Sequence, residues 1–336
     1  MNPPEPDGVS HALVESPLQL LCTVEAHAAG LLGPRTRVLL RDDVPGLSAA
    51  LDSLRATGLP EGLTIDTRSP WAIAADRSPI RATGDACSGL FQALLLVPGR
   101  VPQLTLIDDG LATLDLVARL ADPSQPLLRP GKPASLLRRA VGHAAARAVR
   151  RLAGRGRLEI FTALALPEPD RSRVRELGVQ IVPNSLEWLR SRPRSEVIAE
   201  PTVVIGAALV ADGLVDAESY VMWMTKQAAS GPVRYIPHRR HRREVVERIA
   251  ALPGVTVAEP GAPVEVRLRG LSAGQRVICL PTTAALLLPP LLEPRGVAIE
   301  VHDVAEDWWT PRASPALREH LREVLRQLPD NTVGAP

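Results

Sequence analysis

An α/β fold with two Rossmann-like domains is the architecture that this sequence predicts, on three observations. The chain has 336 residues, more than one hydrophobic core usually supports, so two domains of roughly 150 residues each are expected. Short runs rich in Leu, Val and Ile alternate with longer helical patterns, which is typical of parallel sheets joined by crossover helices. A polar stretch at residues 190–200 separates two series of these runs. We therefore expect an N-terminal domain at residues 9–198 and a C-terminal domain at residues 199–329, with a cleft between them.

The first series of runs predicts the strands of the N-terminal domain. They are expected at His11–Glu15, Arg37–Arg41, Leu63–Asp66, Gln103–Ile107, Leu158–Thr162 and Val179–Val182. The first helix is expected at Pro17–Leu31, because proline is favoured in the first turn and Leu20, Val24 and His27 share one face.

The second series predicts the sheet of the C-terminal domain. Its strands are expected at Val203–Ile205, Val233–Ile236, Val255–Ala258, Arg276–Leu280 and Val297–Val301. Ligands of open α/β sheets bind beyond the carboxyl ends of the strands. The residues that directly follow each run are therefore the first place to look for chemistry.

The composition excludes some classes of protein. Hydrophobic residues make up 45% of the chain, which is enough to fill two cores. The 39 basic and 37 acidic residues leave a net charge of +2, which is too small for wholesale nucleic-acid binding. Three isolated cysteines lack the paired spacing of a zinc site and are odd in number, so a reducing compartment is expected; they are Cys22, Cys87 and Cys279.

Neither a secretory signal nor a membrane span is expected. The first residues, MNPPEPDG, are acidic and proline-rich, unlike the basic start of a secretory signal. The longest apolar stretch, Ala284–Leu292, is interrupted by Pro289 and Pro290 and is too short to cross a bilayer. We expect a cytoplasmic protein whose contact with a membrane would be at the surface of its inner face.

The first motif with chemical interest is Glu15-Ser16-Pro17-Leu18-Gln19. Here a strand passes into a helix, which leaves backbone N–H groups and the Gln19 amide available to a ligand. The structural alternative is that Ser16 caps the helix and Pro17 occupies its first position.

The second motif is Ile107-Asp108-Asp109-Gly110, two carboxylates and a glycine directly after an apolar strand. Such a sequence forms turns. It also supplies a candidate general base, and the like-charged neighbour is expected to raise the pKa of one carboxyl.

The third motif is the basic run Tyr235–Arg243, which contains His238 and leads into a helix expected at Glu244–Leu252. Cations at a helix N-terminus oppose the macrodipole, at about 0.3–1 kcal/mol for each exposed charge. A bound phosphate or carboxylate would remove this conflict. The alternative is a solvated basic face.

Two further motifs follow in the C-terminal half. Glu265, within Pro263–Val266, is by itself an ordinary surface acid. Thr282 and Thr283 lie between a strand and an apolar helix, where hydroxyls usually cap the helix but can also cradle a phosphate.

In combination, these motifs resemble those of the bacterial lipooligosaccharide sialyltransferases and the related bacterial α-2,8-polysialyltransferases. The similarity consists of Ser-Pro-Leu-Gln at 16–19, Asp-Asp-Gly at 108–110, Pro-His-Arg-Arg at 237–240 and the hydroxyl pair at 282–283. These occur in the right order between residues 11 and about 303, and Gly206 followed by Asp212-Gly213 resembles another segment of the family. The resemblance implies a GT-B fold, with the nucleotide in the C-terminal domain and the acceptor facing the N-terminal domain.

The resemblance implies catalytic roles for particular residues. Asp109, or its neighbour Asp108, would take the proton of the acceptor hydroxyl. His238 would protonate or hydrogen-bond the departing CMP phosphate. In some relatives an acid after the strand that matches Val203–Ile205 has the role of base, so Asp212 is the reserve candidate.

The resemblance also implies binding roles. Thr282 and Thr283 would hold the phosphate, and Glu265 would bind the ribose hydroxyls of cytidine. The family commonly has a proline where Arg239 stands and two serines where the threonines stand. Threonine keeps the hydroxyl, whereas Arg239 adds a charge that suits a different nonulosonic acid or donor pose. The remaining candidate binding residues are Gly206, Ser16 and Gln19.

The segment Arg129–Arg157 has nine basic residues, Lys132 among them, and no acid. Apolar residues at Leu136, Leu137, Val141, Val149 and Leu152 are expected to form one face of a helix. A basic amphipathic helix suits an anionic membrane surface, where lipid-linked acceptors lie, and it suits an acidic glycan equally well. The alternative is a helix packed on the sheet with solvated arginines.

The resulting hypothesis is an inverting, metal-independent sialyltransferase of bacterial cell-surface glycan synthesis. Its donor would be CMP-sialic acid or a related CMP-nonulosonate, acting as co-substrate with no cofactor, and its acceptor a glycan, with no nucleic-acid partner. Two alternatives stay open: a GT-B transferase that uses a UDP- or GDP-sugar, and a non-catalytic GT-B protein that binds anionic glycans.

Overall fold

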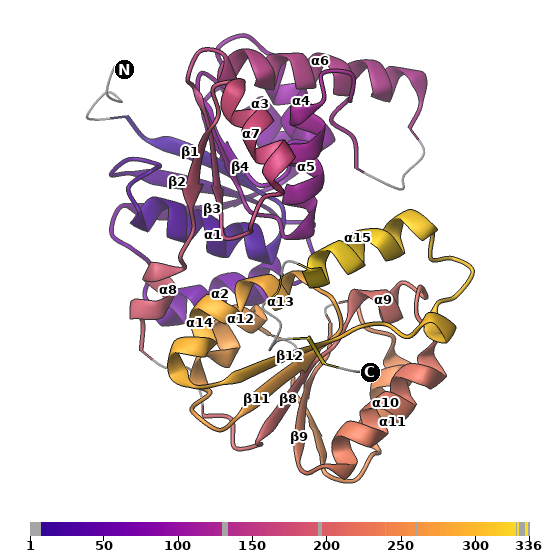
Figure 1. The fold of residues 1–336 in the computed structure, drawn as a ribbon. Helices are drawn as coiled ribbons and strands as arrows, with labels where there is room; N and C mark the ends of the chain where they lie inside the picture. Colours follow the sequence, from indigo (N-terminus) through magenta and orange to yellow (C-terminus); the bar gives the residue numbers. More distant parts are fainter. Residues whose placement is uncertain are drawn as a thin grey trace. The chain divides into compact units, whose positions relative to one another are not determined.

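The computed structural model describes residues 8–129, 134–193, 197–238, 240–259, 261–326, 328 and 333–334. Arg239 and Lys132 lie outside the described residues. The chain forms two compact units that divide after Arg192, each built on a parallel sheet with helices on its faces (Figure 1). The prediction of two α/β domains is confirmed.

Unit 1 contains a seven-stranded sheet in the order β3-β2-β1-β4-β5-β6-β7. Each pair of neighbouring strands is parallel. Its strands are β1 (Ser10–Val14), β2 (Thr36–Arg41), β3 (Leu63–Arg68), β4 (Ile80–Thr83), β5 (Leu104–Ile107), β6 (Leu158–Thr162) and β7 (Gln180–Pro183). The order of the strands reverses between β1 and β4. In open α/β sheets this switch point is where a ligand-binding crevice forms.

The helices of unit 1 cover both faces of the sheet (Figure 1). Those on one face are α1 (Pro17–Ala28), α2 (Leu47–Thr57) and α8 (Glu187–Ser191). Those on the other are α3 (Pro70–Ala75), α4 (Gly89–Leu95), α5 (Leu111–Ala121), α6 (Leu136–Ala153) and α7 (Glu168–Glu176).

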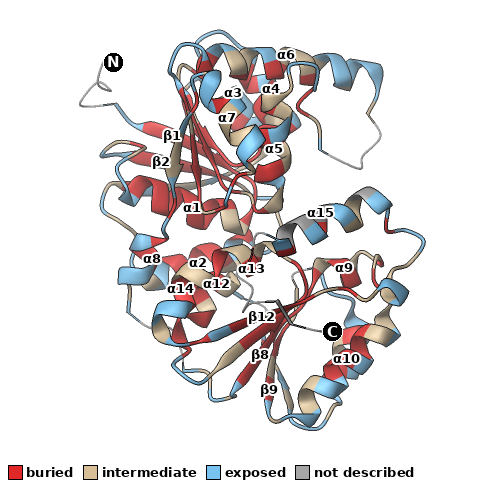
Figure 2. Cartoon of the chain, in the orientation of Figure 1, coloured by how far each residue is buried: buried red, intermediate tan, exposed pale blue. Residues whose placement is uncertain are grey.

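Burial of both faces explains the apolar runs in the central strands, such as Ala12–Val14 of β1. All five residues of β1 are buried, as a central parallel strand requires. Under α1, Ala12 of β1 and Ile107 of β5 pack with Cys22 and Ala26 of the helix. In Figure 2 the central strands are coloured as buried and the outer helix surfaces as exposed. The core thus fixes the carboxyl ends of β1 and β5 in the sheet.

Unit 2 contains a second parallel sheet in the order β10-β9-β8-β11-β12-β13. Its strands are β8 (Thr202–Ile205), β9 (Val233–Ile236), β10 (Val255–Val257), β11 (Arg276–Cys279), β12 (Ala298–His302) and β13 (Val333–Gly334). The switch point of this sheet lies between β8 and β11.

Short helices connect the strands of unit 2. The α-helices are α9 (Ala208–Ala211), α10 (Ala217–Ala229), α11 (Arg243–Ala250), α12 (Val264–Arg267), α13 (Thr283–Leu287), α14 (Pro289–Leu292) and α15 (Pro315–Arg326). The 3₁₀ turns are η1 (Leu268–Gly270), η2 (Glu293–Arg295) and η3 (Glu306–Trp308). Helices α10 and α11 pack together, as do α12, α13 and α14. No described helix has both the length and the apolar character needed to cross a bilayer.

Most expected strands form within one or two residues of their predicted ends, but β4 and β13 were not predicted. Strand β4 has only four residues, Ile80–Thr83, and includes the polar Arg81, so its sequence lacks the apolar run of a buried strand. The first helix ends at Ala28, not at Leu31, because the backbone turns through Gly30 in a left-handed conformation.

Candidate functional site

The carboxyl ends of β1 and β5 meet through two of the predicted residues of unit 1. Ser16 caps α1 by accepting a hydrogen bond from the backbone N–H of Gln19, as the structural alternative required. The same hydroxyl donates a 2.8 Å hydrogen bond to Oδ1 of Asp109. Ser16 is therefore both a helix cap and a direct partner of the candidate base.

Asp109 has the properties of a general base near neutral pH. Burial raises the pKa of its carboxyl to about 6, against the opposing effect of the Ser16 and Gln19 hydrogen bonds. The backbone N–H of Asp109 donates to the hydroxyl of Thr113 at 3.0 Å, and the following Gly110 has a left-handed φ of 69°. A carboxyl with this pKa is mostly ionised at pH 7 and can accept a proton.

Asp108 is buried, and its carboxyl forms hydrogen bonds within the protein. It is fully buried and accepts hydrogen bonds from the Thr162 hydroxyl at 2.5 Å and the Ala163 N–H at 2.6 Å. Burial raises its pKa to about 6. The expectation that the like-charged neighbour raises the pKa was wrong: for Asp109 the like charge is Asp85, and its effect is smaller than that of burial. Asp108 ties β5 to β6 and has no exposed surface for a substrate.

Gln19 and Glu15 also lie at this switch point. The Gln19 Oε1 atom accepts a 2.8 Å hydrogen bond from the Glu15 backbone N–H. A Cβ atom at Gly84, directly after β4, would stand 2.2 Å from Cγ of Gln19, so only glycine admits that side chain. The side chain of Gln19 is thus held in place within the protein. Gly84, which directly follows β4, was not predicted as a residue of this site because strand β4 itself was not predicted.

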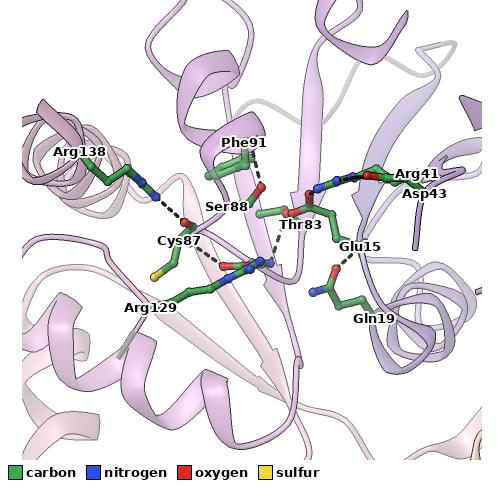
Figure 3. A network of polar contacts seen from close by, with 11 residues as sticks. Glu15, Gln19, Arg41, Asp43, Thr83, Cys87, Ser88, Phe91, Arg129 and Arg138 are labelled. Atoms are coloured by element: carbon green, nitrogen blue, oxygen red, sulfur yellow. Dashed lines mark hydrogen bonds and ion pairs between the residues drawn. The ribbon is translucent and has the colours of Figure 1, made fainter. Parts of the chain in front are cut away.

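A cavity of about 280 Å³ lies near these residues. Its wall contains three arginines, Arg41, Arg129 and Arg138, together with Cys87, Ser88, Gly89, Leu90, Leu128 and Ala134. We call it the arginine pocket. Figure 3 shows Arg41 beside Glu15 and Asp43, and Arg138 reaching the carbonyl group of Cys87. Burial raises the pKa of the Cys87 thiol to about 12, so this thiol is neutral.

In unit 2, three predicted residues follow three neighbouring strands. Ile205 of β8 is in register with Ile236 of β9 and with Cys279 of β11. Gly206, His238 and Thr282 therefore emerge at the same edge of the sheet, on both sides of its switch point. This is the position expected for a ligand site.

Gly206 permits the close approach of two of these strand ends. Its N–H donates a 2.8 Å hydrogen bond to the carbonyl oxygen of Ile236. A Cβ atom here would lie 2.8 Å from the backbone nitrogen of His238 and 2.8 Å from the hydroxyl of Tyr235. Any side chain at this position would displace the segment that carries His238.

The ring of His238 has a defined orientation. Its Nδ1 atom accepts a 3.2 Å hydrogen bond from the backbone N–H of Arg240. In the neutral ring Nε2 then carries the proton. A histidine in this tautomer can donate a hydrogen bond from Nε2 to an anionic oxygen.

Thr282 occupies the N-cap position of α13, but its side chain makes no capping hydrogen bond. Its hydroxyl oxygen is buried and makes no hydrogen bond to nitrogen or oxygen among the described residues, and it interacts with the Cys279 thiol. The capping alternative therefore does not hold for this hydroxyl. A thiol is a weak hydrogen-bond partner, so a bound ligand oxygen would satisfy this buried hydroxyl better.

Glu265 is not the surface acid that its sequence suggested. It lies in the first turn of α12 and only 6% of the residue is exposed, and burial raises its pKa. Helix α12 contacts α13, so the helix of Glu265 lies against the helix that begins at Thr283.

Three arginines of the basic run after β9 have partners within the protein. Arg240 forms a 3.0 Å ion pair with Asp212, Arg243 forms one of 2.7 Å with Glu247, and Arg242 donates to the carbonyl oxygen of Ala211. A bound anion beside this run stays a prediction. Asp212, the reserve base, is committed to Arg240.

Helix α6 packs against unit 1 through the part that follows its first turn. Val149 and Leu152 are buried, whereas Leu136 and Leu137, at its first two positions, are 87% and 75% exposed. Arg150 donates to backbone carbonyls that include those of Arg119 and Leu120. Membrane contact by this segment stays a prediction.

No protein-family model and no curated protein matches the sequence. Among solved structures, the chain is similar to an α/β-galactoside α-2,3-sialyltransferase from Photobacterium phosphoreum. The identity is 11% and the TM-score 0.50, with 97% of this chain and 98% of that chain covered. It is also similar to LpCGTa in complex with UDP, at 14% identity and a TM-score of 0.45 over 95% and 94% of the two chains. The chain has the GT-B fold, as predicted.

Proposed function

We propose that this chain is an inverting glycosyltransferase that transfers sialic acid, or a related nonulosonic acid, from a CMP-activated donor to a hydroxyl of a glycan acceptor. The observation that carries the proposal is Asp109, a half-buried carboxyl with a pKa of about 6 that accepts a hydrogen bond from Ser16 at the switch point of unit 1. The similarity to a solved sialyltransferase of the same fold supports the choice of donor.

The proposed reaction is a single displacement at the anomeric carbon of the donor sugar. The acceptor oxygen forms a bond to that carbon as the bond from the carbon to the CMP phosphate oxygen breaks. The bonding electrons leave with the phosphate, and the acceptor proton passes to the carboxylate of Asp109. One displacement inverts the configuration, because the acceptor oxygen attacks opposite the leaving group.

The leaving phosphate would be stabilised by unit 2. His238, with Nε2 as its donor nitrogen, would form a charge-assisted hydrogen bond to the phosphate. The buried Thr282 hydroxyl would donate another, and Thr283 a third. These bonds strengthen as charge develops on the phosphate, so they lower the barrier and do not merely bind the donor.

Two other groups complete the proposed donor site. Glu265, on the helix packed against α13, would accept hydrogen bonds from the ribose hydroxyls. Gly206 would keep the strand ends close enough for the phosphate to reach His238. The described residues contain no group of three His, Cys, Asp or Glu side chains arranged as metal ligands, and in this proposal donors on the protein neutralise the phosphate.

Calorimetric titration with CMP, UDP and GDP tests the choice of nucleotide. We expect CMP to bind at least tenfold more tightly than UDP or GDP. We also expect Glu265→Gln to lower the affinity for CMP. Tighter binding of UDP or GDP would assign the chain to a transferase that uses one of those nucleotides. Absence of binding by all three would contradict a role as a nucleotide-sugar transferase.

A further inference from the structure

We propose that the arginine pocket binds a carboxylate or phosphate group of the acceptor, so that the acceptor of this enzyme is an acidic glycan. This inference rests on the proposed function, because it takes Asp109 as the base that meets the acceptor. The pocket belongs entirely to unit 1, as Asp109 does.

The wall of the pocket is cationic. Arg41, Arg129 and Arg138 line it, and the other lining residues that the structure describes are neutral. Guanidinium groups form paired hydrogen bonds with carboxylates and phosphates, which a neutral sugar hydroxyl cannot match. The volume of about 280 Å³ is near the lower end of the roughly 300–1,000 Å³ typical of small-molecule sites.

Carboxylates outside the pocket wall hold two of these arginines in place. Glu15 and Asp43 bind Arg41, each at 2.5 Å. Asp85, which is 8% exposed, accepts hydrogen bonds from Nε and Nη2 of Arg129. The arginines are therefore preorganised before a ligand binds, which reduces the entropy that binding would cost.

Arg138 provides the uncompensated charge. Its Nη1 donates to the side-chain oxygen of Gln92 and its Nη2 to the carbonyl oxygen of Cys87, at 2.7 Å for the latter. Both partners are neutral, and among the described residues no ion pair cancels the charge of this guanidinium. A half-buried cation with neutral partners favours an anionic ligand.

Arg129 connects the pocket to the candidate base. Its guanidinium interacts electrostatically with Asp85, with Glu15 and with Asp109. Glu15 and Asp109 follow β1 and β5, which flank β4 in the sheet, and Asp85 follows β4 itself. An acceptor anchored in the pocket would therefore present its neighbouring hydroxyl groups to the carboxylate of Asp109.

The test uses pairs of small probes, each an acidic sugar and an uncharged sugar of related structure. The first pair is methyl β-D-galactosiduronic acid and its uncharged methyl ester, and the second is galactose 6-phosphate and galactose. Binding to the full chain is followed by NMR titration without donor. We expect at least one acid to bind about tenfold or more tightly than its neutral partner, as charge-assisted hydrogen bonds would provide. Equal binding within both pairs would overturn the inference.

Two pairs of variants locate the effect. Arg138→Gln should abolish the preference for the acid, whereas Arg139→Gln, an exposed change of equal charge on the same helix, should retain it. A Cβ atom at Gly89 would meet nothing within 4 Å, so Gly89→Asp adds a negative charge to the pocket wall without a clash. It should bind the acid at least tenfold more weakly than Gly89→Asn does. Retention of the preference in both Arg138→Gln and Gly89→Asp would contradict the assignment.

The failure of this inference can be distinguished from that of the proposed function. CMP should bind Arg138→Gln and wild type equally, because the proposed donor site is in unit 2. If CMP does not bind wild type but the acid preference is lost in Arg138→Gln, the proposed donor is wrong and the pocket stands. If CMP binds and the acids show no preference, only the acidic acceptor is excluded. Melting temperatures of all four variants confirm that they fold.

Discussion

The hydroxyl of Ser16 donates a 2.8 Å hydrogen bond to Oδ1 of Asp109, although 93 residues separate them in the sequence. The same hydroxyl accepts from the N–H of Gln19, so its proton is directed to the carboxylate. This contact favours the ionised form of Asp109, whereas burial favours the protonated form, and the balance gives a pKa of about 6. In the proposed mechanism the base is therefore Asp109 and not Asp108, which is fully buried.

The first prediction concerns that assignment. Asp109→Asn keeps the shape of the side chain but cannot accept the acceptor proton, so kcat should fall by about 10²–10⁴-fold. CMP affinity should stay close to that of wild type, because Asp109 lies in unit 1. Steady-state kinetics and CMP titration measure the two effects. Full activity in Asp109→Asn together with an inactive Asp212→Asn would move the role to Asp212.

The second prediction is a pH profile. Since the base must be deprotonated and burial raises the pKa of Asp109 to about 6, kcat/KM should fall tenfold per pH unit well below pH 6. Ser16→Ala removes a hydrogen bond that lowers this pKa, so its profile should shift to higher pH. Rates of wild type and Ser16→Ala from pH 5 to 8 test this, and identical profiles would show that the hydrogen bond does not act on the titrating group.

The third prediction tests the structural role of Asp108, the carboxyl next to the proposed base. Asp108→Asn cannot accept from both the Thr162 hydroxyl and the Ala163 N–H, so the free energy of unfolding should fall by about 1–3 kcal/mol. Urea denaturation measures this, with Asp52→Asn, whose side chain is 72% exposed, as control. Unchanged stability in Asp108→Asn would contradict the structural role.

The loss of stability in Asp108→Asn should be larger at low pH than at neutral pH. The native pKa of Asp108, about 6, is higher than its ordinary value of 3.8, so the native state retains the proton more strongly than the unfolded state. The stabilisation from this difference is complete below about pH 4 and is lost as the pH rises through 6. The destabilisation of Asp108→Asn should therefore be larger at pH 4 than at pH 7.

The fourth prediction concerns the proposed phosphate site. His238→Ala should lower kcat more than it weakens CMP binding, because its hydrogen bond strengthens as the phosphate departs. The double change of Thr282 and Thr283 to Ala should lower kcat and also weaken CMP binding. Glu265→Gln should mainly raise the donor KM, because the ribose contact is the same in the ground and transition states. Unaltered CMP binding in the threonine and Glu265 variants would place the nucleotide elsewhere.

The fifth prediction uses the close approach at Gly206. Gly206→Ala puts a Cβ atom 2.8 Å from the backbone nitrogen of His238, and the resulting shift should cost about 1–3 kcal/mol of stability. Transfer should fall as well, because the shift moves His238. Gly261→Ala, whose Cβ would have its nearest neighbour at 4.0 Å, is the matched control. Equal activity and stability in the two variants would exclude a role for this approach.

Much of the fold could be predicted because parallel strands buried on both faces contain short apolar runs, as at Ala12–Val14 of β1 and Val203–Ile205 of β8. It missed β4, since a four-residue strand containing Arg81 has no such run. That omission hid Gly84 and Asp85, and with them the reason why Gln19 and Arg129 are fixed. Local sequence does not reveal residues that a missed strand brings together.

The candidate site was predictable where it follows recognised strands, as at Asp109, Gly206 and His238. Electrostatic details were not, because they depend on partners distant in the sequence. Arg240, which the sequence shows only as part of a basic run, pairs with Asp212, and Glu265, by itself an ordinary surface acid in the sequence, is buried. The arginine pocket combines residues from three separate segments, around 41, 87 and 129–138.

The most direct test of the central claim is mass spectrometry of the products formed from CMP-sialic acid and a set of neutral and acidic bacterial glycans. We predict a glycan heavier by one sialic acid residue, with release of CMP, in wild type. Asp109→Asn and His238→Ala should form it at least a hundredfold more slowly. Glycosylation from UDP- or GDP-sugars but not from CMP-sialic acid, or equal product formation by all three proteins, would contradict the account.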